Sequence, residues 1–160
     1  MIQKLTGGLK ILAGEAKSDP TEGASRLNKP SLNRLPEVLI VDDEEPLLLS
    51  IADGLSIYQQ HFHLLTATNG VDAVKLLKAI PVIDLVITDL SMPKMDGFEL
   101  LAYIKRNYPQ IPVIMMTAYG TPKIEEVVNR LGIFRYLEKP LDINIIADTI
   151  FDALAISTDN

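Results

Sequence analysis

With 160 residues, of which 48% are hydrophobic, the chain has the size and apolar content of one folded domain, which excludes a wholly disordered protein. Its formal charge of −6 repels phosphate backbones and argues against direct DNA binding. No cysteine is present and the two histidines, His61 and His63, are too few for a zinc cluster, so any metal must be held by oxygen. The longest apolar run, 111–116, is far shorter than the roughly 18 residues that cross a bilayer, and we expect a cytoplasmic protein without membrane contact.

Residues 1–35 are predicted to form a flexible extension that precedes a folded domain over residues 36–160. The extension carries six basic and three acidic residues, whereas the rest of the chain has a net charge of −9. Glycine and proline interrupt this segment so often that no apolar period long enough to pack survives. A short helix over residues 2–13 is a minority alternative, because two glycines lie in its middle.

From residue 37 onward, short apolar runs alternate with helical periods. The runs at 38–41, 83–87 and 111–116 are nearly continuous, which is typical of strands buried on both faces. The runs at 63–67 and 133–137 are more polar and suit the edges of a sheet. We therefore predict five strands.

A helix is predicted after each of these strands, because apolar residues recur at helical spacing. These stripes lie within 48–55, 73–80, 96–104, 124–131 and 143–150. Start signals support three of the helices: Asp96 with Glu99, Asn69 three residues before an aspartate, and Thr121 before a proline. Five strand–helix units predict an α/β fold, (βα)5, in which a doubly wound parallel sheet carries helices on both faces.

Acidic and polar residues follow the predicted strands at the edge where ligands bind in open α/β sheets. Asp42 and Asp43 follow the first strand, Asp89 the third, Thr117 the fourth and Lys139 the fifth. Three carboxylates at one edge repel one another unless a cation neutralises them. Mg²⁺ is a divalent ion that prefers such oxygen ligands, so we expect a magnesium site.

Asp89 is the natural nucleophile of this cluster, since it belongs to the central strand. A carboxylate can accept a phosphoryl group as an aspartyl phosphate without a general base. The phosphoryl oxygens then need a positive charge and a hydroxyl donor, and Lys139 and Thr117 supply one of each. The pattern predicts a phosphoacceptor site.

Four segments, in this order, resemble the receiver domain of two-component response regulators, in the CheY-like superfamily. The similarity covers residues 37 to about 155 and is specific, because each segment stands at a strand end. The segments are Val41-Asp42-Asp43-Glu44, Thr88-Asp89-Leu90-Ser91-Met92-Pro93-Lys94-Met95-Asp96-Gly97, Met116-Thr117-Ala118 and Tyr136-Leu137-Glu138-Lys139-Pro140. The resemblance implies a flavodoxin-like sheet with strand order 2-1-3-4-5.

The resemblance also implies how the metal and the acceptor are arranged. Mg²⁺ would be held by Asp43, Asp89 and the backbone carbonyl of Ser91, while Asp42 would act largely through a metal-bound water. Asp89 would be the phosphoacceptor, and the peptide bond between Lys139 and Pro140 would be cis.

Roles around the phosphoryl group follow from the same resemblance. Thr117 and Tyr136 would form the switch pair, and the small side chain of Ala118 would leave access to the phosphate. Ser91 and Tyr119 would frame the approach of hydrolytic water, and we expect this pair to slow the loss of phosphate because neither positions a water well.

We predict a single-domain response regulator, which is a phosphoacceptor and not an enzyme. A sensor histidine kinase or phosphotransfer protein would phosphorylate Asp89, and the output would be contact with a downstream protein and not with DNA. We expect a monomer or weak dimer, because Arg135 stands where dimerising relatives usually have an acid. Two alternatives remain: a phosphorylation-independent binding module on the same scaffold, and a haloacid-dehalogenase-type hydrolase, which would need a second acid where Ser91 stands.

Overall fold

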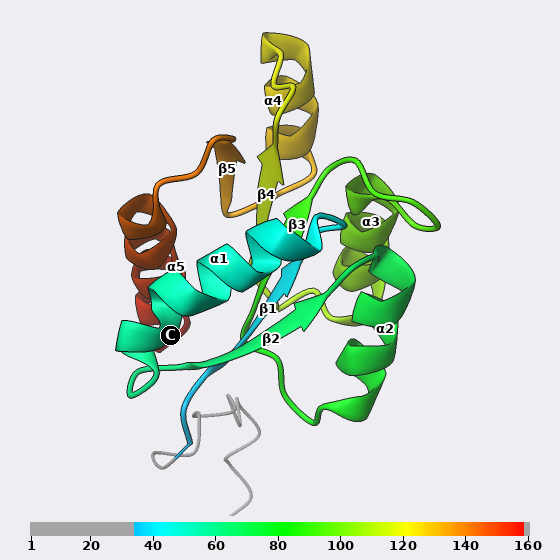
Figure 1. The fold of residues 1–160 in the computed structure, drawn as a ribbon. Coiled ribbons are helices and arrows are strands. Elements are labelled where there is room, and N and C mark those ends of the chain that lie inside the picture. Colours follow the sequence, from blue (N-terminus) through cyan, green and yellow to red (C-terminus); the bar gives the residue numbers. More distant parts are fainter. Residues whose placement is uncertain (1–33, 159–160) are drawn as a thin grey trace, which may run out of the picture.

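The five predicted strands form one parallel sheet in the order β2-β1-β3-β4-β5 (Figure 1). A computed structural model describes residues 34–158, so the predictions for residues 1–33 lie outside the described part of the chain. The strands are β1 (Glu37–Val41), β2 (His63–Ala67), β3 (Leu85–Asp89), β4 (Val113–Thr117) and β5 (Arg135–Glu138). The predicted fold class and the strand order implied by the resemblance are both confirmed.

Each strand is followed by a helix, and the predicted start signals are present. Asp96 and Glu99 form a reciprocal capping box, while Asn69 and Thr121 each accept a hydrogen bond from the backbone N–H three residues on. The helices are α1 (Glu45–Leu55), α2 (Gly70–Ala79), α3 (Gly97–Asn107), α4 (Pro122–Arg130) and α5 (Ile143–Thr158), with a short 3₁₀ helix, η1 (Ser56–Tyr58), after α1.

Two apolar cores lie on the two faces of the sheet. Helices α1 and α5 cover one face, and α2 and α3 cover the other (Figure 1). Helix α4 adds Val128 and the partly buried Ile124 to the core on the α2/α3 side. Alternate residues of β1 serve each core: Val38 and Ile40 pack on the α1/α5 side, and Leu39 and Val41 on the opposite side. The central strands are therefore buried on both faces, which explains their continuous apolar runs.

Three strands begin two residues later than their apolar runs. The run at 83–87 corresponds to a strand at Leu85–Asp89, and the runs at 111–116 and 133–137 correspond to β4 and β5. Ile83 and Ile111 are buried but precede the hydrogen-bonded ladder, since an apolar run records burial and not strand pairing. The shift places Asp89 at the carboxyl end of its strand.

The first described residue, Arg34, is tied to the sheet by a carboxylate. Its guanidinium donates to both oxygens of Asp84, at 2.7 and 2.9 Å, and the Glu37 N–H donates to the same carboxylate at 2.7 Å. Arg34, which belongs to the segment that we expect to be an extension, therefore contacts the residue that precedes β3.

We expect the Arg34→Ala substitution to lower the free energy of unfolding by roughly 0.5–1 kcal/mol, because it removes a partly exposed bidentate pair. Asp84→Ala should lower it by roughly 1–3 kcal/mol, since the Glu37 N–H also loses its partner. Urea denaturation of the full chain measures both values. Equal losses in the two variants would contradict this account.

Candidate functional site

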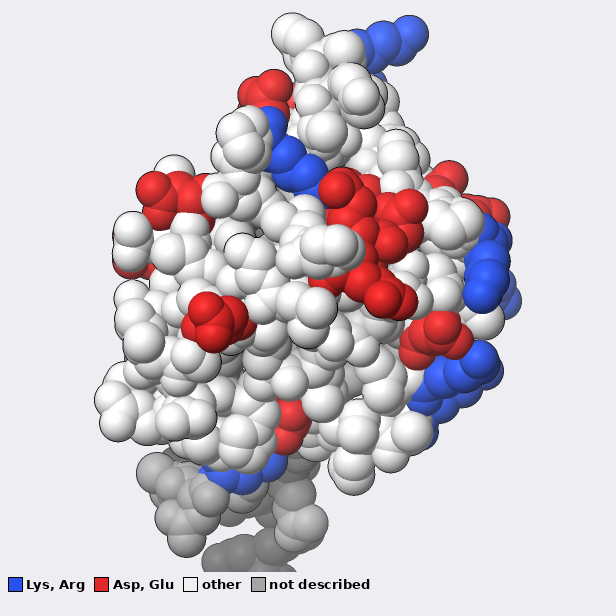
Figure 2. Space-filling view, viewed as in Figure 1, with Lys and Arg blue, Asp and Glu red and all other residues white. Residues whose placement is uncertain are grey.

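Three carboxylates converge at the carboxyl end of the sheet. Asp42 and Asp43 follow β1 and Asp89 ends β3, and these two strands are neighbours. One oxygen from each residue lies within 4.8 Å of the others. Asp42 is fully buried, Asp89 is 5% exposed and Asp43 lies at the surface. Figure 2 shows acidic side chains gathered over this end of the central strands, and the set offers the oxygen ligands that Mg²⁺ prefers.

Lys139 reaches this cluster from the segment after β5. Its Nζ donates to Asp42 Oδ2 at 2.6 Å and lies 3.4 Å from Asp89 Oδ1 and 3.5 Å from Glu44 Oε1. The lysine side chain is 10% exposed, so its interactions with Asp42 and Asp89 are little screened by water, whereas Glu44 is 65% exposed. The Lys139–Pro140 peptide bond is cis, as the resemblance implies.

Burial and charge act together on the ionisation of this cluster. Burial raises the pKa of Asp89, the nearby ammonium of Lys139 counteracts part of this effect, and the charge of Asp42 adds to it. Burial disfavours the charged form of Lys139, but its hydrogen bond with Asp42 and the charges of both carboxylates outweigh this and raise its pKa. One ammonium thus faces several carboxylates, and the excess negative charge favours a bound cation.

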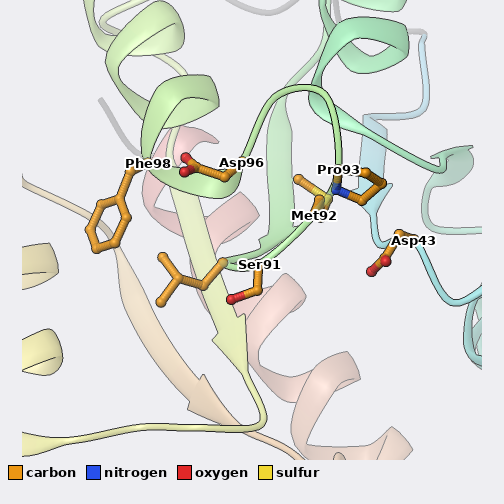
Figure 3. Close-up of a pocket in the computed structure, with 7 residues that line it drawn as sticks. Asp43, Ser91, Met92, Pro93, Asp96 and Phe98 are labelled. Atoms are coloured by element: carbon orange, nitrogen blue, oxygen red, sulfur yellow. The ribbon is translucent and has the colours of Figure 1, made fainter.

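The connection between β3 and α3 forms the other wall of the site. Asp43 and Ser91 line one hollow of about 500 Å³. Figure 3 shows that they come from two different connections. The remaining lining residues are Leu90, Met92, Pro93, Asp96 and Phe98. Gly97 lets α3 begin against this strand end, because a Cβ there would overlap the Asp89 carbonyl oxygen.

The predicted hydroxyl donor, Thr117, ends β4, the strand that pairs with β3. Thr117 is 2% exposed, and its Oγ1 accepts a hydrogen bond from the Tyr119 N–H at 3.2 Å. Ala118 is exposed, and Tyr119 is 82% exposed. The predicted roles of these two residues in phosphate access and hydrolysis remain predictions.

Tyr136 lies on β5 with its ring half-buried and its hydroxyl fully buried. The hydroxyl has no hydrogen-bond partner in the part of the chain that the structure describes. It stands against Gly120, a residue that the sequence reasoning missed although it directly follows the Thr117-Ala118-Tyr119 segment. Glu44 is the third carboxylate near Lys139, and the sequence alone does not indicate a role for it.

Comparisons with known proteins identify the family. Residues 38–151 match the family model described as "Response regulator receiver domain". The transcriptional regulatory protein GlrR of Escherichia coli (strain K12) is 35% identical over 123 residues, which cover 77% of this chain and 27% of that protein. The response regulator protein FleR of Pseudomonas aeruginosa is 34% identical over 114 residues, covering 71% of this chain and 24% of FleR.

A solved structure agrees with these matches. The signal receiver domain of an HD domain-containing protein from Pseudomonas fluorescens Pf-5 superposes with a TM-score of 0.71 at 34% identity, covering 79% of this chain and 100% of that one. The chain belongs to the response regulator receiver domain family, as the resemblance implies.

Members of this family act in two-component signal transduction, where they accept phosphoryl groups from histidine kinases and bind Mg²⁺ at an acidic pocket. They are generally phosphoacceptors and not enzymes. The chain spans about a quarter of the length of the two named regulators. In residues 34–158, no helix combines the length and apolar character needed to cross a membrane.

Replacement of Lys139 by Met should lower the free energy of unfolding by about 3–5 kcal/mol in metal-free buffer, because buried Asp42 and Asp89 lose their shared cation. Lys75→Met is the matched control, since Lys75 pairs with Asp72 on the exposed surface of α2. The control should change the free energy of unfolding far less than Lys139→Met does, because its ion pair is exposed to water. Urea denaturation measures both, and an unchanged midpoint for Lys139→Met would refute the assignment.

Asp89→Asn should stabilise the metal-free protein at pH 7, because it removes a buried charge. The folded-state pKa of Asp89 is raised, so the penalty of the carboxylate is absent below the unfolded pKa of about 3.9 and grows as pH rises through the folded pKa. The stabilisation should therefore shrink as the pH falls from 7 toward 4. Thermal unfolding across this range provides the measurement, and a variant less stable than wild type at pH 7 would contradict it.

Proposed function

We propose that this chain receives a phosphoryl group on Asp89 from the phosphohistidine of a sensor histidine kinase or phosphotransfer protein. A carboxylate oxygen of Asp89 forms the new P–O bond as the P–N bond to the donor histidine breaks. The observation that carries the proposal is the convergence of a nearly buried acceptor, a buried ammonium and an exposed carboxylate at one strand edge.

The residues fit the proposed Mg²⁺ site. Asp43, Asp89 and the backbone carbonyl of Ser91 would hold the ion, and Asp42 would take part through a bound water. Asp43 and Ser91 line the same hollow, and the three carboxylates supply the negative charge that a divalent cation requires. When bound, the ion neutralises charge on the phosphoryl oxygens.

Two further side chains would hold the phosphoryl oxygens. Lys139 Nζ lies 3.4 Å from Asp89 Oδ1, so it can pair with a phosphoryl group added to that carboxylate. Thr117 Oγ1 accepts a hydrogen bond from the Tyr119 N–H. The hydroxyl proton of Thr117 therefore remains available to donate to a phosphoryl oxygen. Asp42 keeps Lys139 in place through its 2.6 Å hydrogen bond.

The proposed output is contact with a downstream protein through a surface of α4, β5 and α5, controlled by Thr117 and Tyr136. The guanidinium of Arg135 on β5 lies 3.1 Å from the Asp152 carboxylate on α5, so a symmetric dimer through this face would compete with an internal ion pair. We therefore propose a monomer or weak dimer. A single-domain role, the absence of DNA contact and a cytoplasmic location stay predictions.

The experiment is incubation with acetyl phosphate and Mg²⁺, followed by intact mass. Wild type should gain one phosphoryl group, Asp89→Asn none, and Asp43→Asn should be labelled at least about tenfold more slowly because its metal site is impaired. Asp53→Asn, an exposed acid on α1, is the control and should label like wild type. Stoichiometric labelling of Asp89→Asn would refute the acceptor, whereas an unlabelled wild type would favour the phosphorylation-independent binding module.

A further inference from the structure

The Tyr136 hydroxyl is an unusual feature of the β5 surface. Its oxygen is buried and has no hydrogen-bond partner among residues 34–158, although buried hydroxyls are almost always paired. Burial raises the pKa of the phenol, and Glu138 on β5 and Glu125 on α4 add to the effect. The surroundings thus hold the ring in place by packing and not by a hydrogen bond.

Gly120 provides the space that this hydroxyl fills. A Cβ on Gly120 would overlap the hydroxyl oxygen and would lie 3.3 Å from the ring carbon Cζ. Unlike Gly132, whose φ of +74° favours glycine but which has open space around it, Gly120 does not have a left-handed backbone. Glycine is therefore needed at position 120 for room and not for backbone conformation.

We infer that Gly120 is a positioning residue for Tyr136: its missing side chain admits the hydroxyl to the buried position beside the β4–α4 connection. A methyl group at position 120 occupies that volume and drives the ring toward solvent. No direct hydrogen bond is required, because steric exclusion alone sets where the ring can stand.

The same connection leads back to the phosphoacceptor site. Gly120 stands three residues after Thr117, and the intervening Tyr119 N–H donates to Thr117 Oγ1. A movement of the Thr117 hydroxyl that breaks this hydrogen bond would therefore act on the backbone segment against which Tyr136 packs. This second step rests on the proposed function, and it makes Gly120 the point where a change at Asp89 reaches the surface of β5.

A double-mutant cycle tests the steric step without phosphorylation. Gly120→Ala should lower the equilibrium constant for folding by about tenfold or more, as overpacking does. In a Tyr136→Phe background, which lacks the overlapping oxygen, the same change should lower it by less than about threefold. Gly132→Ala is the control, and its loss should be equal in both backgrounds because nothing surrounds that position. Equal losses for Gly120→Ala in the two backgrounds would overturn the inference.

Tyrosine titration by NMR gives the second readout, with Tyr136→Phe assigning the signal. Gly120→Ala should move the pKa of Tyr136 down toward the ordinary value, while uptake of phosphate from acetyl phosphate stays within about threefold of wild type. Phosphorylation should shift the Tyr136 signal in wild type but not in Gly120→Ala. An unchanged pKa overturns the steric step, whereas an unlabelled wild type overturns only the proposed function.

Discussion

The ammonium of Lys139 is the interaction on which the rest of the site depends. Asp42 has no exposure and Asp89 very little, so water screens their charges poorly, and the Lys139 ammonium is the cation that faces both carboxylates. The strand order makes the cluster possible, because β1 and β3 are neighbours and bring the two acids together. The backbone N–H of Lys139 also donates to the backbone carbonyl of Thr117, and this hydrogen bond helps to hold β5 in register with β4.

The fold was predictable because its determinants are local. Alternating strand and helix periods, with caps at Asn69, Asp96 and Thr121, specify a (βα)5 chain before any long-range contact is considered. The predicted strand boundaries were less accurate. Ile83 and Ile111 extend the apolar runs because both are buried in the core, but they lie before the paired segments of β3 and β4. Pairing with a neighbouring strand decides where a strand begins, and one sequence segment does not contain that information.

The residue types of the site were also predictable, because each chemical group stands at a strand end. The burial and contacts of these site residues could not be predicted from the sequence. Asp42 and Asp43 are adjacent, yet one is buried and the other exposed, because the chain turns away from the sheet between them. The proximity of Glu44 to Lys139 and of Gly120 to Tyr136 joins segments far apart in sequence. Such contacts follow only from the packed structure.

Rigidity is distributed unequally around the acidic cluster. β3 and β4 are buried along their whole length, and β1 is buried at all but its first residue. Close packing therefore makes these strands resist displacement by a charge added at Asp89. The part beyond β4 is different: α4 stands out past the end of the sheet (Figure 1), Val128 is its buried residue, and β5 is largely exposed. Segments with few buried contacts open at low free energy. We therefore expect the proposed phosphoryl group on Asp89 to displace the β4–α4 connection more readily than the central strands. The weaker packing beyond β4 therefore supports the proposed route of a response, from Thr117 past Gly120 to β5.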